Sequence, residues 1–497
     1  MNKMQLSKSD YMLFLRHPAW MWLKKREPAK LPPVSEETQA IFDAGYLFES
    51  YAEQIFPDAV RLGFDGFDEY RTLTLRTQEA LASGAKTIFQ ARFEADNLTC
   101  ICDCLQVVGD KSFDLFEMKS TTKPKIDHDY DLSFQRAVLE KAGYKVRNVA
   151  VVHANNEYVR KGAVDAKKLV SISDITDQVF EKEAETEVNI KKALEVMNCK
   201  RCPDISPSLV GLSAFNEWLE IYKTLIGVNQ YDIYNLCSLN AKKIGELEKL
   251  KIKNILDIPD EFPLNDRQLL QVMATKKDDI IIDKDQIKNF LSQIKFPLYF
   301  LDYETFSGVV PQFNGLKPYE QMPFQYSLHK LSADSKLEHF EFLHRENSNP
   351  VDELSKSLKE IIGREGTILA WNDSFEKGCN SRMGQLAPEF ERFYEELNAR
   401  IIDLMTPFRA GHYAHKDFFG SASIKKVLPA LIPELSYNDL DIHDGGSAQR
   451  LWMAAILEGK KDEEKEKILD NLLEYCKLDT LAMVEIYKHL VKITNQK

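Results

Sequence analysis

Hydrophobic and polar positions in the first 205 residues follow both the period of strands and the period of helices. Alternation of apolar and polar residues, or a run rich in valine, predicts strands at 90–108, 113–119 and 146–153. Helical spacing of apolar residues or a high charge content predicts helices at 36–56, 129–143 and 185–198. Ser9 or Asp10 is expected to cap an earlier helix. A mixed helix-and-strand domain is therefore expected over 1–205.

The remaining chain divides into a helical part and a second mixed part. Residues 209–290 are predicted to be all-helical, and the stretch 203–208, rich in Pro and Ser, is a plausible boundary. After the helical part, the pattern predicts a strand at the acidic segment 300–306 and two more strands at 324–331 and 338–343. A helix at 350–363 and a strand at 367–371 follow, and the rest is mainly helical. The pattern predicts an α/β (α+β) multidomain protein with domains at 1–205, 206–295 and 296–497.

Composition narrows the class of protein. The chain has 497 residues, of which 44% are hydrophobic and 29% charged, as in ordinary globular proteins. The sequence contains no long apolar run and no apolar core of a signal peptide, so we expect no membrane partner and a cytoplasmic location. The eight cysteines are scattered, unlike a secreted disulfide framework. The formal charge of −12 means that any nucleic-acid path must be a local basic strip.

Two acidic signatures in the C-terminal part carry the strongest chemical signal. In Phe-Leu-Asp-Tyr-Glu-Thr-Phe at 300–306, Asp302 and Glu304 point to one face of a strand. In Glu-Tyr-Cys-Lys-Leu-Asp-Thr at 474–480, Tyr475 and Asp479 are four residues apart and share one face of a helix. Carboxylates that converge without lysine partners are costly unless a cation lies among them. Two-metal phosphodiester chemistry needs such an arrangement.

With these signatures in order, residues 296–497 resemble a DEDD-type exonuclease domain of the ribonuclease H-like superfamily, in its tyrosine variant. The family's second motif is matched by Asn372, Phe375 and Glu376. The usual acid at that position is Asp, so Glu376 departs from the pattern, and Asp373 is the alternative ligand. The longer side chain of glutamate would change the spacing of a bound metal.

The resemblance implies a specific set of roles. The metal ligands would be Asp302, Glu304, Glu376 and Asp479, holding two Mg²⁺ or Mn²⁺ ions about 4 Å apart. Tyr475 would orient or deprotonate the attacking water. The family's activity is 3′→5′ exonucleolytic cleavage that releases nucleoside monophosphates.

A second constellation lies in the N-terminal part. Asp103 occurs in an alternating segment, and the sequence Glu117-Met118-Lys119 follows about a dozen residues later. On a strand Glu117 and Lys119 share one face. Two acids can hold a metal, while a lysine can hold hydroxide and neutralise developing charge.

These residues make 1–205 resemble a RecB-like PD-(D/E)xK nuclease. Upstream, Glu49 lies in a helical segment where that family places a further metal-binding acid, and downstream Gln135 matches a helical motif. The family has Tyr four residues after the Gln, whereas this chain has Leu139. The resemblance implies catalytic roles for Glu49, Asp103, Glu117, Lys119 and Gln135, with one or two metal ions bound by the three acids.

The cysteines bear on a finer resemblance, because many RecB-like nucleases carry an iron–sulfur cluster. Cys199 and Cys202 match part of the required set, but no cysteine occurs near His17, where an early ligand is expected. A cluster needs four thiolates, so we predict that it is absent. A zinc site formed by Cys199, Cys202 and His17 is one alternative, and reduced cysteines are the other.

The middle part suggests how a strand of nucleic acid is held. Residues 228–260 resemble a helix–hairpin–helix element, although an ordinary solvated linker is the alternative. The local basic strip consists of Lys242, Lys243, Lys249, Lys251 and Lys253. Near the C-terminal signatures, Ser423 and Lys425 either touch a substrate phosphate or lie on a solvated face.

Over its whole length the chain resembles a bacterial family of unknown function that pairs the two nuclease-like domains. We therefore predict a metal-dependent nuclease acting on DNA or RNA, with a C-terminal exonuclease and an N-terminal DNA nuclease. Phage defence or repair would suit such a protein. One alternative is a nucleic-acid-binding scaffold in which one or both sites are inactive. Another is one active domain, with the second used for recognition.

Overall fold

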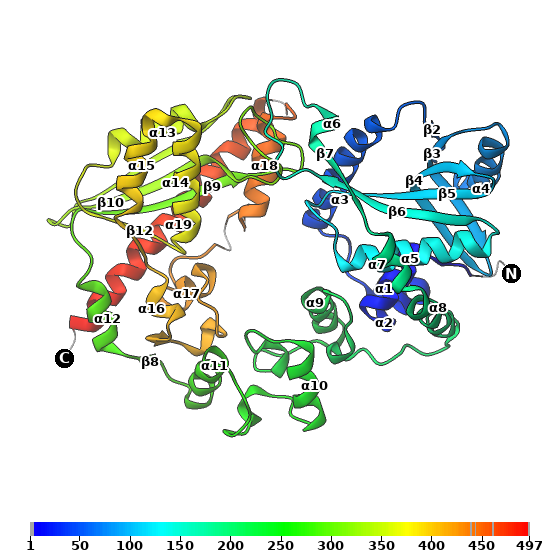
Figure 1. Cartoon of the computed structure of the whole chain (residues 1–497). Helices are drawn as coiled ribbons and strands as arrows, with labels where there is room; N and C mark the ends of the chain where they lie inside the picture. The colour runs from blue at the N-terminus through cyan, green and yellow to red at the C-terminus, as the bar shows by residue number, and fades with distance from the viewer. Residues whose placement is uncertain (1–3, 438–439, 443, 460–461, 496–497) are drawn as a thin grey trace.

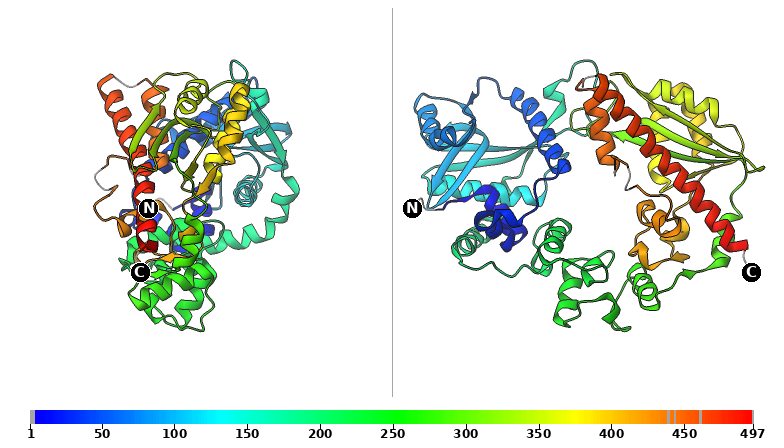
Figure 2. Two further views of the ribbon diagram at one scale, coloured as in Figure 1. Left: turned by 90° about the vertical axis from the view of Figure 1, so that its left-hand side faces the viewer. Right: turned by 180° about the vertical axis from the view of Figure 1, so that it is seen from behind.

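Two sheet-containing domains lie side by side and are joined below by a run of helices (Figures 1 and 2). The computed structural model describes residues 4–437, 440–442, 444–459 and 462–495. The expected α/β multidomain fold is confirmed. Within these described ranges, no helix combines the length and the apolar content needed to cross a membrane.

The N-terminal domain is built on a seven-stranded mixed sheet in the order β2-β3-β4-β5-β6-β7, with β1 paired to β4. The strands are β1 (Leu6–Ser7), β2 (Val60–Arg61), β3 (Thr87–Ala95), β4 (Leu98–Gly109), β5 (Ser112–Lys119), β6 (Lys145–Ala154) and β7 (Val170–Asp174). The helices are α1 (Lys8–Arg16), α2 (Pro18–Arg26), α3 (Glu36–Ala52), α4 (Phe67–Ala82), α5 (Ile126–Lys141), α6 (Ala166–Leu169), α7 (Thr176–Glu181) and α8 (Glu183–Asn198). Helix α5 packs on β3, β4 and β6, while α3 contacts β5 and β6.

The joining region contains short helices with a small core of their own. They are α9 (Phe215–Ile226), α10 (Ala241–Lys249), α11 (Asp266–Lys277) and α12 (Lys284–Leu291). Within 228–260, the segment that resembles a helix–hairpin–helix element, one α-helix, α10, lies between the 3₁₀ turns Ile233–Asn235 and Ile255–Asp257. The predicted all-helical character of 209–290 is also broken by strand β8 (Ile281–Ile282), which pairs with β14.

The C-terminal domain has a five-stranded sheet in the order β11-β10-β9-β12-β13. Its strands are β9 (Leu298–Phe306), β10 (Met322–Leu331), β11 (Leu337–Leu343), β12 (Thr367–Ala370) and β13 (Ile401–Asp403), and β14 (Tyr413–Ala414) lies outside this sheet. The helices are α13 (Val351–Ile361), α14 (Ser374–Leu386), α15 (Glu391–Asn398), α16 (Thr406–Arg409), α17 (Ile424–Leu431), α18 (Gly445–Ile456) and α19 (Asp462–Asn495). Helices α13 and α14 cover one face of the sheet, and α18 and α19 cover the other (Figure 2). Strand β9 is therefore central and covered on both sides.

A loop after β9, residues 307–321, leaves the C-terminal domain and packs against the N-terminal one. Val309 and Val310 are buried in one cluster with Phe48 and Met118 of the N-terminal domain. The hydroxyl of Tyr319 donates to the backbone carbonyl of the residue that follows Lys119. The loop thus connects the strand that carries Asp302 to the strand that carries Lys119.

Replacing Val309 by Asp should destabilise this contact between the domains. The side chain is 1% exposed, so the new carboxylate would be buried among apolar groups, at a cost of about 2 kcal/mol or more. Thermal unfolding followed by circular dichroism should show a clear fall in the melting temperature. Val188→Asp is the matched control, because Val188 is 49% exposed. Equal melting temperatures for the two variants would contradict the described contact.

Candidate active sites

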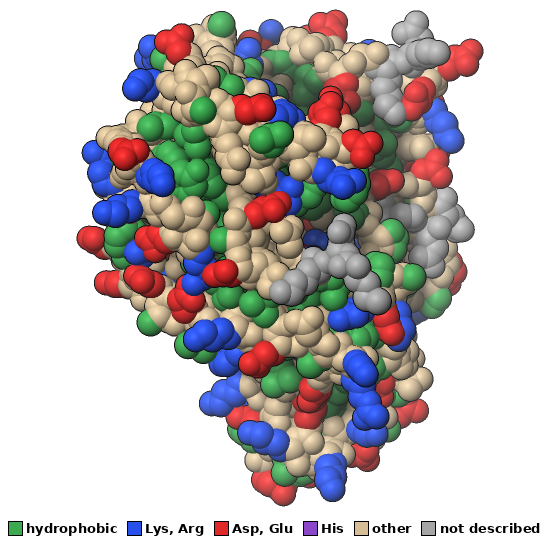
Figure 3. All heavy atoms as spheres, turned by 90° about the vertical axis from the view of Figure 1, so that its right-hand side faces the viewer, with side chains coloured by type: hydrophobic (Ala, Val, Ile, Leu, Met, Phe, Trp, Pro, Cys, Tyr) green, Lys and Arg blue, Asp and Glu red, His purple; other side chains and the backbone are tan. Residues whose placement is uncertain are grey.

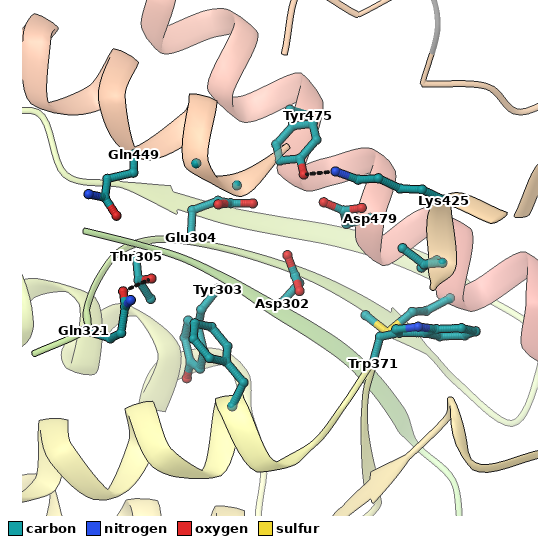
Figure 4. Close-up of a pocket in the computed structure, with 15 residues that line it drawn as sticks. Asp302, Tyr303, Glu304, Thr305, Gln321, Trp371, Lys425, Gln449, Tyr475 and Asp479 are labelled. Atoms are coloured by element: carbon teal, nitrogen blue, oxygen red, sulfur yellow. Dashed lines mark hydrogen bonds between the residues drawn. The ribbon is translucent and has the colours of Figure 1, made fainter. Parts of the chain in front are cut away.

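Strand β9 positions two carboxylates on the sheet face covered by α18 and α19. Asp302 and Glu304 point toward α19, whereas Tyr303 between them points to the opposite face, toward α14 (Figure 4). The hydroxyl of Tyr303 donates to the side-chain oxygen of Asn380 on α14, 2.8 Å away. The predicted alternation along this strand is confirmed.

Helix α19 contributes the facing residues. Tyr475 and Asp479 lie on the side of this helix that faces Glu304 and Asp302 (Figure 4). Cys476 is also turned to the site, with its Sγ 3.8 Å from Oδ2 of Asp302. The sequence signatures at 300–306 and 474–480 are thus brought together, the arrangement that the resemblance implied.

Two residues from neighbouring segments complete the polar contacts. The hydroxyl of Tyr437 donates to Oδ1 of Asp479 at 2.6 Å. Lys425, near the start of α17, donates from Nζ to the hydroxyl of Tyr475 at 3.0 Å. Tyr437 lies in a segment without a periodic pattern, so the sequence offered no signal for it.

These side chains surround a pocket of about 450 Å³. Its walls also include Trp371, Phe375 and Gln449. Gly445 closes one side, where a Cβ would lie 3.4 Å from Oε2 of Glu304. A larger residue at position 445 would crowd the carboxylate, so glycine leaves room for it.

Burial and mutual repulsion make the carboxylates of this pocket weak acids. Burial, followed by the charges of Asp479, Glu304 and Glu376, holds the pKa of Asp302 well above its usual range. Burial and the charge of Asp479 raise the pKa of Glu304 to about 8, although Lys425 opposes the shift. Burial raises the pKa of Asp479 to about 6. One lysine does not balance this set of acids.

The donor set fits a divalent cation. Carboxylate oxygens of Asp302 and Glu304 and the Sγ of Cys476 all lie within 4.8 Å of one another. Oxygen donors are those that Mg²⁺ and Mn²⁺ prefer. A cation among these groups would relieve the repulsion that raises their pKa values.

Glu376, on the first turn of α14, lies beside the pocket without lining it. Its side chain is 2% exposed, and its Oε2 has no hydrogen-bond partner among the described residues. Burial raises its pKa to about 8, and its charge in turn raises the pKa of Asp302. The alternative ligand, Asp373, forms an ion pair with Lys377. An orphaned buried carboxylate near Asp302 favours Glu376 over Asp373 as the second-motif residue.

The N-terminal constellation is centred on a fully buried glutamate. Glu117 accepts at Oε1 from Nζ of Lys119 at 2.6 Å and from Nζ of Lys8 at 2.7 Å. Its Oε2 accepts from Nε2 of Gln135 at 2.8 Å. Burial alone would raise the pKa of Glu117, but the two ammonium groups hold it well below its usual range. Unlike the C-terminal pocket, this cluster pairs its central acid with cations.

The other predicted acids lie close to this centre. Asp103 accepts from the backbone N–H of Met118 at 2.9 Å, and burial and the charge of Glu117 raise its pKa to about 7. Glu49, on α3, accepts from Nε2 of Gln90 at 2.8 Å. Its charge contributes to the raised pKa of Asp103, so the two carboxylates are neighbours. The structure thus gathers all five residues predicted for this domain.

Two further members of the cluster escaped the sequence analysis. Lys8 comes from the first turn of α1, which carries no motif. Asp131 accepts from Nε2 of Gln135 at 2.9 Å and lies 3.4 Å from Nζ of Lys119. Its position four residues before Gln135 on α5 was a usable signal, since such residues share a helix face. Leu139, the departure from the family pattern, is fully buried in the core instead.

The possible zinc site would need the ring of His17 to be free to join Cys199 and Cys202. His17 uses both ring nitrogens elsewhere, one with the carbonyl of Ser206 at 3.0 Å and one with the N–H of Ala19 at 3.1 Å. Its ring also stacks on Trp218. Cys199 is exposed, and Cys202 is partly buried, both as free thiols. His17 is therefore a packing residue of α1, α2 and α9.

Comparisons with known proteins give two similarities. The family described as "Domain of unknown function (DUF2779)" matches residues 299–423. The "Uncharacterized protein MG366" of Mycoplasma genitalium is 26% identical over 225 residues, which cover 41% of this chain and 33% of that protein. The chain thus spans about a third of the length of this relative. The family match includes Asp302, Glu304 and Glu376 and ends before Tyr475 and Asp479.

Proposed function

We propose that the C-terminal domain hydrolyses phosphodiester bonds of DNA or RNA with the help of a divalent cation. The main support is the convergence of Asp302, Glu304 and Asp479 in one pocket beside Tyr475, where burial raises the pKa of each acid. The central strand β9, with helices on both faces, agrees with the ribonuclease H-like resemblance. Cleavage from the 3′ end is the direction that this resemblance implies.

The residues of this pocket would have two roles, binding the cation and orienting the attacking water. Asp302 and Glu304 would hold the cation, together with Asp479, and Glu376 would reach it by rotation of its side chain. When bound, the cation supplies Lewis-acid activation of water and neutralises charge on the phosphate. Tyr475 would orient the attacking water through its hydroxyl.

Lys425 has a position from which it assists this tyrosine. Burial and the nearby carboxylates raise the pKa of Tyr475 well above its usual range, which disfavours its use as a base. The ammonium group of Lys425, 3.0 Å from the hydroxyl, opposes that effect. The same ammonium group is a suitable partner for a phosphate oxygen of the substrate.

A second activity of the N-terminal domain, cleavage of DNA by a RecB-like PD-(D/E)xK site, is favoured by the cluster around Glu117. Asp103 and Glu49 would hold a cation with Glu117, while Lys119 would position the attacking water and Gln135 would orient Glu117. For this, the ion pair of Glu117 with Lys8 would have to loosen when a cation binds.

The test uses the purified full-length protein with Mn²⁺ and end-labelled single-stranded and double-stranded DNA and RNA. Stepwise shortening that Asp302→Ala abolishes and Lys119→Ala spares would support the C-terminal exonuclease. Loss only with Lys119→Ala would assign the chemistry to the N-terminal domain. A protein that binds these strands and leaves them uncut would overturn both hydrolytic proposals in favour of the scaffold.

Removal of one hydroxyl separates the role of Tyr475 from metal binding. In Tyr475→Phe the buried ring stays, and we expect hydrolysis to slow by about a hundredfold because the water loses its orienting group. The rise in melting temperature caused by Mn²⁺ should persist, since the carboxylates are unchanged. Tyr413→Phe removes a buried hydroxyl that contacts His489 and should leave the rate unaltered. Equal rates for both variants would rule out this role of Tyr475.

A further inference from the structure

A second pocket, of about 660 Å³, lies between the joining helices and the C-terminal domain. Aromatic residues from both sides line it, namely Phe215 and Tyr234 from the joining region and Phe419 from the segment before α17. The charged residues in its wall are Lys223 and Lys426, and no Asp or Glu occurs among the described residues that line it. Lys223 pairs with Glu220 at 2.8 Å, so Lys426 is the charged group of this wall that no described carboxylate neutralises.

This pocket and the C-terminal active-site pocket share one helix. Lys425 lines the active-site pocket, whereas Lys426, the next residue of α17, lines the second pocket. The two pockets therefore border adjacent residues of one helix.

Phe419 is held in a conformation that aromatic residues rarely adopt. Its φ is 51°, in the left-handed region, and Gly420 follows with a φ of 68°. A Cβ at position 420 would lie 2.5 Å from the Sγ of Cys237, so only glycine permits the close contact with the joining region. The conformation fixes the ring of Phe419 at the pocket wall.

Lys426 is available for an anion. Its side chain is exposed, and no carboxylate of the described residues lies within ion-pair distance of it. Its Nζ lies 5.5 Å from the centre of the Phe419 ring, which places a cation beside an aromatic face. By contrast, basic and acidic side chains are interspersed over the outer face of the N-terminal domain (Figure 3). Lys426 thus gives the second pocket a cation that can pair with a backbone phosphate.

We propose that this pocket binds single-stranded nucleic acid on its way to the C-terminal active site. A base would stack on Phe419, and a backbone phosphate would pair with Lys426, the combination that binds single strands without regard to sequence. The volume suits roughly one or two nucleotides. The identity of the ligand rests on the proposed phosphodiester chemistry, since the same strand would then enter the pocket beside Lys425.

The test measures binding without hydrolysis. Fluorescence anisotropy in EDTA would follow the full-length protein with labelled oligothymidylate and oligouridylate of about 20 nucleotides. Phe419→Leu keeps an apolar side chain but removes the stacking surface, so we expect about tenfold weaker binding. Lys426→Ala should also weaken binding, and the slope of log Kd against log salt should fall by about 0.7, the value for one phosphate contact. Lys426→Arg should keep most of the affinity.

Lys359→Ala is the matched control. Lys359 also lies over a phenylalanine ring, 5.2 Å from the centre of Phe390, but on α13, away from both pockets. The Lys359→Ala variant should bind the labelled oligonucleotides as tightly as the wild type does. Wild-type affinity for Lys426→Ala and Phe419→Leu would overturn the proposal, as would tighter binding of duplex than of single strands. Because no step depends on cleavage, a protein that binds as expected but cuts nothing would refute the nuclease and retain this pocket.

Discussion

Replacing Asp302 by Asn should reduce metal-dependent hydrolysis by more than about ten-thousandfold, because the pocket loses the carboxylate nearest to its other acids. The same substitution should stabilise the metal-free protein. Burial and the nearby Asp479, Glu304 and Glu376 make the charged form of Asp302 costly in the folded protein, and an amide of the same shape carries no such cost. Loss of activity with a gain in melting temperature distinguishes a metal ligand from a structural carboxylate.

The dependence on pH follows from the direction of the pKa shift. The pKa of Asp302 is higher in the folded protein than in the unfolded chain, so its charge lowers folding stability above the unfolded pKa of about 3.9. The stability gain of Asp302→Asn should therefore be present at neutral pH and vanish as the pH falls to about 4. In addition, Mn²⁺ should raise the melting temperature of the wild type more than that of the variant.

Asp352→Asn is the control for this prediction, since Asp352 is exposed on α13. It should change neither the activity nor the melting temperature in the presence or absence of Mn²⁺. A variant at position 302 that loses activity but also loses stability at neutral pH would contradict the repulsion described for the pocket. In that case the carboxylate would be needed for folding.

The sequence predicted several strands and helices of both domains whose apolar positions face a core, but it missed α4 and β7. Strands β10 and β11 and helix α13 lie within a few residues of the predicted ranges, because their apolar positions face one core. Helix ends were less accurate. Helix α1 begins at Lys8, and its cap is Ser7, because the carboxylate of Asp10 turns back to the N–H of Ser7 and completes a capping box.

Features that depend on distant contacts could not be predicted in this way. Strand β8 has only two residues and forms because β14 pairs with it, so no periodic pattern in the local sequence could predict it. The packing of Val309 against the N-terminal domain is equally nonlocal, as its loop has no regular pattern.

The same distinction applies to the sites. Tyr475 and Asp479 could be paired from the sequence because residues four positions apart on a helix lie on the same face. Glu117 and Lys119 could be paired because residues two positions apart on a strand do so too. Tyr437 and Lys8 reach the two sites through tertiary packing alone. The contrast in charge between the sites was only partly visible, since Lys119 belongs to the motif but Lys8 does not.

That contrast leads to a large expected effect on stability when Glu117 is replaced by Gln. The free energy of unfolding should fall by about 3 kcal/mol, because Lys8 and Lys119 lose the buried carboxylate that both contact. Among the described residues, Asp131, at 3.4–3.7 Å, remains as their ion-pair partner. In addition, one of the two positions that now accept hydrogen bonds would become an N–H₂ donor. At the Oε2 position this group could not accept the hydrogen bond from Gln135, and at the Oε1 position it would face the two ammonium groups.

Denaturant unfolding of the wild type and of Glu117→Gln at neutral pH measures this difference in the free energy of unfolding. The lowered pKa of Glu117 means that its stabilisation is present above the unfolded pKa of about 4.3 and is lost as the pH falls further. The gap between the wild type and Glu117→Gln should therefore narrow in acid. Glu157→Gln is the matched control, because Glu157 is exposed and its pair with Lys317 spans 3.4 Å, and it should cost less than about 1 kcal/mol.

A double variant identifies the cause of the loss. If unbalanced ammonium charge is responsible, Lys8→Met should restore part of the stability of Glu117→Gln, although Lys8→Met alone should be destabilising. Strictly additive effects of the two substitutions would mean that Lys8 and Glu117 do not interact in solution. The coupling also bears on function, since a cation bound by Glu117 must displace Lys8. Lys8→Met should therefore raise the affinity of the N-terminal site for Mn²⁺, measured as a larger increase in melting temperature at equal metal concentration.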